Sequence, residues 1–255
     1  MSRLLSEMSG PALQRTLTED SVIVLPTGSI EHHGPHLPLA TDLLMAEALS
    51  AAAVEAAAAA GVDAWLLPAL AYTKSDEHHW APGTMWLGYD TVMSTLIDIG
   101  RSVAATPARR LVFLNAHGGN VALLQVAIRE LRRRFGLQTF AAGFPVPAGD
   151  GVTGPDELGF GIHAGFGETS MILHLRPELV NLELGVPSVP SHLADYQHIG
   201  FHSKPVVFGW LSDDFGTDGT IGDPTGATAE HGKVLFDDAV ALMSASLIEI
   251  ARFRP

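Results

Sequence analysis

The chain has 255 residues, which is enough to bury a large core within one α/β domain. Its formal net charge of −13 argues against nucleic acid or an anionic membrane as a partner, because both require clustered Lys and Arg. The chain has no cysteine, which excludes disulfides, cysteine nucleophiles and thiolate metal sites, so any metal must be held by carboxylates and by the 12 histidines.

Segments that favour strands alternate with segments that favour helices over the first 142 residues. Buried strands are indicated by short β-branched and aliphatic runs, and helices by Ala- and Leu-rich or amphipathic runs. In chain order we expect a short helix over 11–19, a strand over 21–26, a helix over 43–60, a strand over 62–68, a helix over 89–105, a strand over 109–115, a helix over 121–135 and a strand over 137–142. This alternation predicts an α/β fold with a mainly parallel sheet and helices on both faces.

Past residue 143 the pattern is less regular. Residues 169–175 suit either a helix or a strand, and residues 177–224 predict loops and short strands. A last helix is predicted over 228–253 by apolar residues at helical spacing. Because there is no internal repeat and no low-complexity linker, we expect a single domain over residues 1–255.

The stretch 29–42 holds one Glu, three His and one Asp directly after the first buried strand. Its prolines and glycines oppose regular structure, so we expect a loop at the carboxyl end of that strand, where open α/β sheets place their ligands. Glu31 and His33 are two residues apart and project from the same face of an extended backbone. Together with Asp42 they form the mixed O/N set that Zn or Mn prefers. The alternative is a solvated loop in which Asp42 only caps the helix that follows.

A second polar loop, residues 115–120, follows the third strand of the chain. Because both loops leave parallel strands at the same edge, His117 is a candidate ligand of the same site. Gly118 and Gly119 would let a ligand approach the backbone closely, and Asn120 could cap the next helix. The alternative is a tight turn with His117 in solvent.

Two further loops have the same character. Small residues flank His163 and Glu168 in residues 161–170, where Glu168 is either a charge at a helix start, a metal ligand or a general base. Residues 75–84 combine histidines with Trp80 and suit a substrate pocket. The spacing does not separate these roles.

Taken together, these loops resemble the creatininase family of metal-dependent amidohydrolases. The matching motifs occur in family order over residues 20–235, and they are Gly28 to Pro38 with Asp42, Glu77-His78 with Pro82-Gly83-Thr84, Asn115 to Asn120, His163-Ala164-Gly165 with Glu168-Thr169-Ser170, and Gly222-Asp223-Pro224 with Ala229 to Gly232. Any one motif is weak, but the ordered set is specific.

The resemblance implies a creatininase-like fold with two divalent metal ions, Zn or Mn with Fe as a third option, at the carboxyl ends of the strands. It implies Glu31, His33, Asp42 and His117 as ligands, with Asp42 bridging the ions. Creatinine hydrolases proper have a Glu where this chain has Gly119, and in members with Gly-Gly at this point Glu168 binds the second metal. His163 resembles the acid/base histidine. The catalytic residues are therefore expected to be His163 and Glu168, and the substrate-binding residues His78, Trp80, Gly118 and Gly119.

The resemblance also implies hydrolysis of a C–N bond by a metal-activated water. We expect the substrate to be a small cyclic amide, a lactam or an N-acyl compound rather than a peptide, although Gly119 argues against creatinine itself. The alternatives are a peptidase that trims a short modified peptide during redox-cofactor maturation of the mycofactocin type, a deformylase, and a metal-binding protein without activity. An open pocket would favour the peptidase, and closed four-coordinate metal sites would favour the last.

For the chain as a whole we expect a cytoplasmic enzyme. The first residues lack an apolar signal core, and no window reaches the length of a membrane span. The expected partner is a small-molecule amide substrate, and the family resemblance implies a homo-oligomer, often a hexamer. Residues 196–214 are aromatic-rich, and they suit a lid, a subunit contact or ordinary packing equally well.

Overall fold

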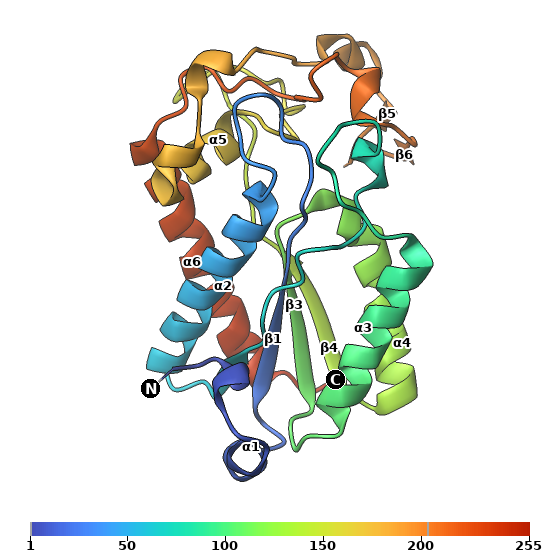
Figure 1. The fold of residues 1–255 in the computed structure, drawn as a ribbon, viewed down its shortest axis with the longest axis vertical. Helices are drawn as coiled ribbons and strands as arrows, with labels where there is room; N and C mark the ends of the chain where they lie inside the picture. The colour runs from blue at the N-terminus through green and yellow to red at the C-terminus, as the bar shows by residue number, and fades with distance from the viewer. Residues whose placement is uncertain (1, 203) are drawn as a thin grey trace.

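A sheet of four parallel strands lies at the centre of the computed structural model, which describes residues 2–202 and 204–255 (Figure 1). The strands occur in the order β2-β1-β3-β4, and their bounds are Val22–Thr27 for β1, Ala64–Leu66 for β2, Arg110–Asn115 for β3 and Gln138–Gly143 for β4. The expected parallel sheet is confirmed. β1 includes Pro26 and ends at Thr27, one residue beyond the strand expected over 21–26. The proline is tolerated because β2 pairs only with Val22–Val24.

Helices cover both faces of this sheet, as expected. One face carries α3 (Tyr89–Ala104) and α4 (Val121–Phe135), and the other carries α2 (Thr41–Ala59) and α6 (Ala229–Arg252), with α5 (Phe166–Leu175) against α6 (Figure 1). Residues 169–175 therefore belong to a helix. The remaining elements are α1 (Gly10–Thr16), the strand pair β5 (Ile199–Gly200) and β6 (Val206–Val207), and 3-10 helices over Leu5–Glu7, Asp76–His78, Gly118–Asn120, Pro177–Leu179, Leu182–Leu184, Ser191–Asp195 and Ser212–Asp214.

Alternate residues of the central strands face opposite layers. Ile23 and Phe113 point to the core under α3 and α4, whereas Val24 and Val112 point to the core under α2 and α6. All of these side chains are almost fully buried. This double burial explains why the strands read as continuous apolar runs.

The polar loops leave the sheet at the carboxyl ends of β1 and β3, at the top of Figure 1. The parallel register pairs Thr27 with Asn115, so the two loops start side by side. The Thr27 hydroxyl donates a hydrogen bond to Asn115 Oδ1 at 2.9 Å, which ties the strand ends together. Within the described part of the chain, none of the helices is both long and apolar enough to cross a membrane.

Candidate metal centre

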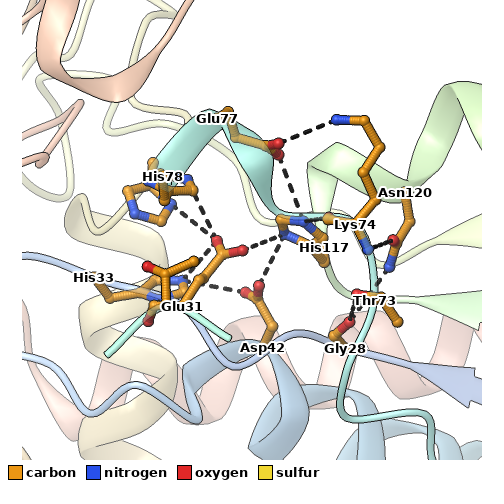
Figure 2. A network of polar contacts seen from close by, with 12 residues as sticks. Gly28, Glu31, His33, Asp42, Thr73, Lys74, Glu77, His78, His117 and Asn120 are labelled. Carbon is orange, nitrogen blue, oxygen red and sulfur yellow. Dashed lines mark hydrogen bonds and ion pairs between the residues drawn. The ribbon is translucent and has the colours of Figure 1, made fainter. Parts of the chain in front are cut away.

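Five side chains that the sequence indicated as ligands converge at this edge of the sheet. Figure 2 shows four of them, Glu31, His33, Asp42 and His117. Three overlapping groups bring their ligand atoms within 4.8 Å of one another, and these are Glu31 with His33 and His163, Glu31 with Asp42 and His117, and His33 with Asp42 and Glu168. The last two groups contain all five expected ligands and share Asp42. The loops after β1 and β3 and the first turns of α2 and α5 therefore supply one continuous set of possible ligands.

Asp42 stands at the centre of this set. It does not cap α2, because the N-cap is Ala40 and Asp42 lies in the first helical turn. Its Oδ1 is 3.2 Å from His33 Nε2, and its Oδ2 is 3.0 Å from His117 Nδ1. The two carboxylate oxygens therefore face two different imidazoles, which is the arrangement a bridging ligand needs.

Backbone carbonyls fix the orientation of both imidazoles. His33 Nδ1 lies 3.1 Å from the Glu31 carbonyl, and His117 Nε2 lies 2.6 Å from the Lys74 carbonyl. A carbonyl only accepts, so each of these nitrogens carries the hydrogen and donates it. In the neutral ring the other nitrogen then presents a lone pair to the carboxylates, and metal-binding histidines are commonly oriented in this way.

The carboxylates of this cluster are buried without enough hydrogen bonds. Glu31 is 1% and Asp42 2% exposed, and Glu31 Oε2 and Asp42 Oδ2 lie 3.1 and 3.0 Å from the same His117 Nδ1, which has no hydrogen to donate while the ring is neutral. A buried carboxylate oxygen without a partner is strongly unfavourable. A cation between these oxygens and the imidazoles would satisfy them, so the residues present fit a divalent metal.

In the metal-free protein, protons partly replace that charge. Burial alone would lower the pKa of His33, but Asp42 and its hydrogen bond outweigh burial and raise it to about 10. Burial also opposes the rise of the His117 pKa, yet the adjacent Glu31 carboxylate holds it well above its usual value. Burial would raise the pKa of Glu31, but His117 lowers it to about 2. The cluster thus holds protonated imidazoles beside ionised carboxylates.

We therefore expect metal binding to release protons and to strengthen as pH rises. A metal ligand must be a neutral imidazole, whereas His33 and His117 are protonated near neutral pH in the metal-free protein. Because these pKa values are raised, the proton competes with the ion until the pH approaches about 10 for His33. Calorimetric titration with Zn²⁺ in buffers of different ionisation enthalpy measures the release. Equal apparent enthalpies in all buffers would contradict this expectation.

His163 lies beside the cluster, with its ring between those of His33 and His78 at centroid distances of 4.2 and 4.1 Å. Its Nε2 is 2.7 Å from the His32 carbonyl, so it donates there and leaves Nδ1 as the free acceptor. Nδ1 is 3.7 Å from Glu31 Oε1. Burial, and then the neighbouring His78 and His33, hold the pKa of His163 well below its usual value, so the ring is neutral.

Glu168 closes the side of the cluster that is nearest to solvent. It lies in the first turn of α5, its side chain is 15% exposed, and its Oε2 accepts a 2.6 Å hydrogen bond from the Ala164 amide. Burial raises its pKa to about 7. A small pocket lies against it, lined by His163 and by small residues that include Gly161, Gly165 and Gly167.

The four expected substrate-binding residues lie in different surroundings. His78 Nε2 is 3.4 Å from Glu31 Oε1, so this ring belongs to the cluster, and burial lowers its pKa to about 4. Trp80 instead donates to Ser212 Oγ at 2.8 Å. A Cβ at Gly118 would have open space, whereas a Cβ at Gly119 would collide with the Glu77 carboxylate. The side chain of Asn120 makes no cap hydrogen bond to α4 and donates instead to Gly28 O at 3.3 Å.

Several residues that position the site were not singled out from the sequence. His36 is buried and lies 3.0 Å from Thr169 Oγ1, which holds the first loop against α5. His32 reaches the Asp218 carbonyl at 2.7 Å. Two of the three histidines in the stretch 29–42 therefore have structural contacts. The only signal available in the sequence was their position beside the ligands.

Glu157 is a fully buried carboxylate that joins the loops around His163. It accepts hydrogen bonds from the backbone amides of Gly149 at 2.5 Å, Phe166 at 3.0 Å and Asp223 at 2.6 Å. We expect Glu157→Gln to lower the free energy of unfolding by about 3 kcal/mol, because an amide hydrogen would face donors in place of a charged acceptor. Urea unfolding of the metal-free protein measures this change, and the exposed Glu183→Gln serves as the control. Equal stability of the two variants would contradict the assigned role.

The fold and the candidate site are shared with known proteins. Residues 6–247 match the family described as creatininase, creatinine amidohydrolase. The chain is 35% identical over 242 residues to the mycofactocin precursor peptide peptidase of Mycobacterium tuberculosis H37Rv, covering 91% of this chain and 86% of that protein. It is 33% identical over 201 residues to the creatinine amidohydrolase of Pseudomonas putida, covering 71% and 75%.

Solved structures give the same result. A creatininase described as the Mn form superposes with a TM-score of 0.74 at 27% identity, covering 100% of both chains. A creatininase variant described as Zn-Zn type has a TM-score of 0.73 at 26% identity, again covering 100% of both chains. The chain belongs to the creatininase family.

Proposed function

We propose that this chain is a metal-dependent amidohydrolase. The observation that carries the proposal is the convergence of Glu31, Asp42 and the partly buried Glu168 with two imidazoles, in which Glu31 Oε2 and Asp42 Oδ2 share a single ring nitrogen, His117 Nδ1. Glu31, Asp42 and His117 would hold one divalent ion, and His33, Asp42 and Glu168 would hold the other. Solved family members described with Mn and with Zn-Zn support this choice of metals.

Bound divalent ions would supply a polarised carbonyl and a water of lowered pKa. The proton transfers of the reaction require side chains of the protein. Amide hydrolysis requires one proton to leave the attacking water and one to reach the leaving nitrogen as the C–N bond breaks. His163 has its free Nδ1 directed into the cluster and its Nε2–H held by the His32 carbonyl. It can accept the first proton and deliver it to the nitrogen, which balances the reaction.

For the substrate, we propose a short peptide. The supporting observation is the 35% identity over 91% of this chain to a protein described as a precursor peptide peptidase. A small cyclic amide is the second candidate, supported by the 33% identity to a creatinine amidohydrolase over 71% of the chain. The peptide proposal replaces our expectation from sequence, which favoured a non-peptide substrate.

The test begins with removal of metal by a chelator, followed by addition of Zn²⁺ or Mn²⁺. The restored protein is then assayed on short peptides, lactams, cyclic ureas and formamides. We expect activity to be lost with the metal, to return with either ion, and to be greatest on peptides. Cleavage of lactams alone would favour the second candidate. Amidase activity that survives complete removal of metal would refute the metal-dependent mechanism.

A further inference from the structure

One buried carboxylate beside the cluster has no part in the proposed mechanism. Glu77 lies in the 3-10 helix Asp76–His78, and its side chain is 10% exposed. Its Oε1 is 3.5 Å from His117 Nε2, the nitrogen that faces away from Glu31 and Asp42 (Figure 2). Glu77 is therefore behind a candidate ligand and cannot bind the same ion as that ligand.

The position of Glu77 depends on Gly119. An ideal Cβ at Gly119 would lie 1.9 Å from Glu77 Oε1 and 2.5 Å from His117 Nε2. Those separations are far below any contact distance, so a side chain at 119 and this placement of Glu77 are incompatible. The backbone of Gly119 does not have a positive φ, which means that space rather than conformation requires glycine here. The absence of a side chain at Gly119 therefore leaves space for the Glu77 carboxylate beside Nε2 of His117.

Several contacts hold Glu77 in this place. Lys74 Nζ lies 3.2 Å from Glu77 Oε2. The Glu77 carbonyl accepts a 3.2 Å hydrogen bond from Ser212 Oγ, which in turn accepts one from Trp80 Nε1. Ser212 is fully buried. Because Glu77 is held at both its backbone and its side chain, it would lose little conformational entropy on pairing with a positively charged His117 ring.

The net charge of the proposed metal centre indicates what the Glu77 carboxylate would do. Two divalent ions would bring four positive charges, and the inner ligands Glu31, Asp42 and Glu168 offset three. Lys74 is itself paired with Asp76 at 2.6 Å, so the charge of Glu77 is not cancelled by the lysine alone. The Lys74 carbonyl takes the His117 hydrogen bond at 2.6 Å, and Glu77 adds a negative charge close to the same N–H.

We propose that Glu77 is a positioning residue that strengthens metal binding at the site of Glu31, Asp42 and His117, by stabilising the positive charge that an ion places on the His117 ring. This inference rests on the proposed metal centre. An outer carboxylate of this kind typically changes metal affinity by about 10- to 100-fold. Glu77 touches His117 and none of the other four candidate ligands, so its effect is selective for one of the two ions.

The test is a Zn²⁺ titration of the metal-free protein in competition with a chromophoric chelator, which measures both dissociation constants without an activity assay. Glu77→Gln keeps the shape of the side chain and removes its charge. We expect one of the two dissociation constants to rise by about tenfold or more, and the other to change much less. Asp76→Asn is the matched control, because Asp76 also pairs with Lys74 but is 50% exposed and makes no contact with the cluster.

The possible outcomes distinguish failure of the Glu77 inference from failure of the proposed metal centre. Two unchanged constants in Glu77→Gln would overturn the inference while leaving the metal centre intact. Equal weakening by Asp76→Asn would also overturn it, since the effect would then belong to the charge around Lys74. A wild-type protein that binds no Zn²⁺ would instead refute the proposed function, and the inference with it. Thermal unfolding of each metal-free variant separates these results from a loss of folding.

Discussion

Replacing Asp42 by Asn is expected to lower turnover by about a thousandfold, because loss of metal-ion stabilisation is worth several kcal/mol and each 1.4 kcal/mol is about a factor of ten. Asp42 is shared by the two proposed ion sites, and its two oxygens face His33 and His117 separately. Glu31 also faces both rings, but its Oε1 is 3.8 Å from His33 Nε2, so Asp42 is the carboxylate that lies close to both. The same change should therefore reduce the content of both ions, and elemental analysis measures this together with the rate.

Asp90→Asn is a matched control for this experiment. Asp90 lies in the first turn of α3, as Asp42 lies in the first turn of α2, but it is exposed. We expect this variant to retain both ions and full activity. An Asp42→Asn protein that kept two tightly bound ions would contradict the bridging role, even if its activity were low.

Replacing His163 by Ala is expected to lower kcat by about 10²- to 10⁴-fold, which is the usual contribution of a positioned proton donor and acceptor. The metal content should remain at the wild-type value, because the two proposed ion sites use other side chains. His79→Ala is the control, since His79 is an exposed histidine whose Nδ1 lies 3.1 Å from Asp76 O in its own loop. Loss of an ion in His163→Ala would assign His163 as a ligand, in the group it forms with Glu31 and His33.

Much of the fold could be predicted from the sequence because the two signals involved are local. Apolar runs such as Val22–Leu25 indicate strands buried on both faces, and the Ala-rich run after Asp42 indicates a helix. The parallel arrangement follows from their alternation. Residues 169–175 were ambiguous because the short run Met171–Leu173 fits either a buried helix or a buried strand, and the contact of α5 with α2 and α6 decides in favour of a helix.

Part of the candidate ligand set could also be anticipated from the residues, because Glu31, His33 and His117 lie on loops that directly follow strands; Glu168, in the first turn of α5, was assigned by the family resemblance. The roles of neighbouring polar residues could not be anticipated. Asp42 and Asn120 both lie at helix starts, where capping is the usual local role. Their side chains instead contact residues of other loops, namely His33 and His117 for Asp42 and Gly28 for Asn120. Glu77 and Glu157 act across more than 30 and more than 60 residues respectively, on His117 and on Asp223. No short-range pattern records such contacts.

Gly119 shows how the two kinds of information combine. The sequence marked it as a departure from creatinine hydrolases, in which a Glu is expected, and so indicated a different substrate. The structure places the Glu77 carboxylate in the space that a side chain at 119 would enter. A carboxylate thus approaches His117 from another loop, which the spacing of residues within the 115–120 loop could not reveal.

Anomalous diffraction from crystals grown with Zn²⁺ or Mn²⁺ tests the central claim most directly. We predict two peaks, one among Glu31, Asp42 and His117 and one among His33, Asp42 and Glu168, with Asp42 touching both. Crystals without a peak at this edge of the sheet, or with ions bound elsewhere while these five side chains remain bare, would contradict the account.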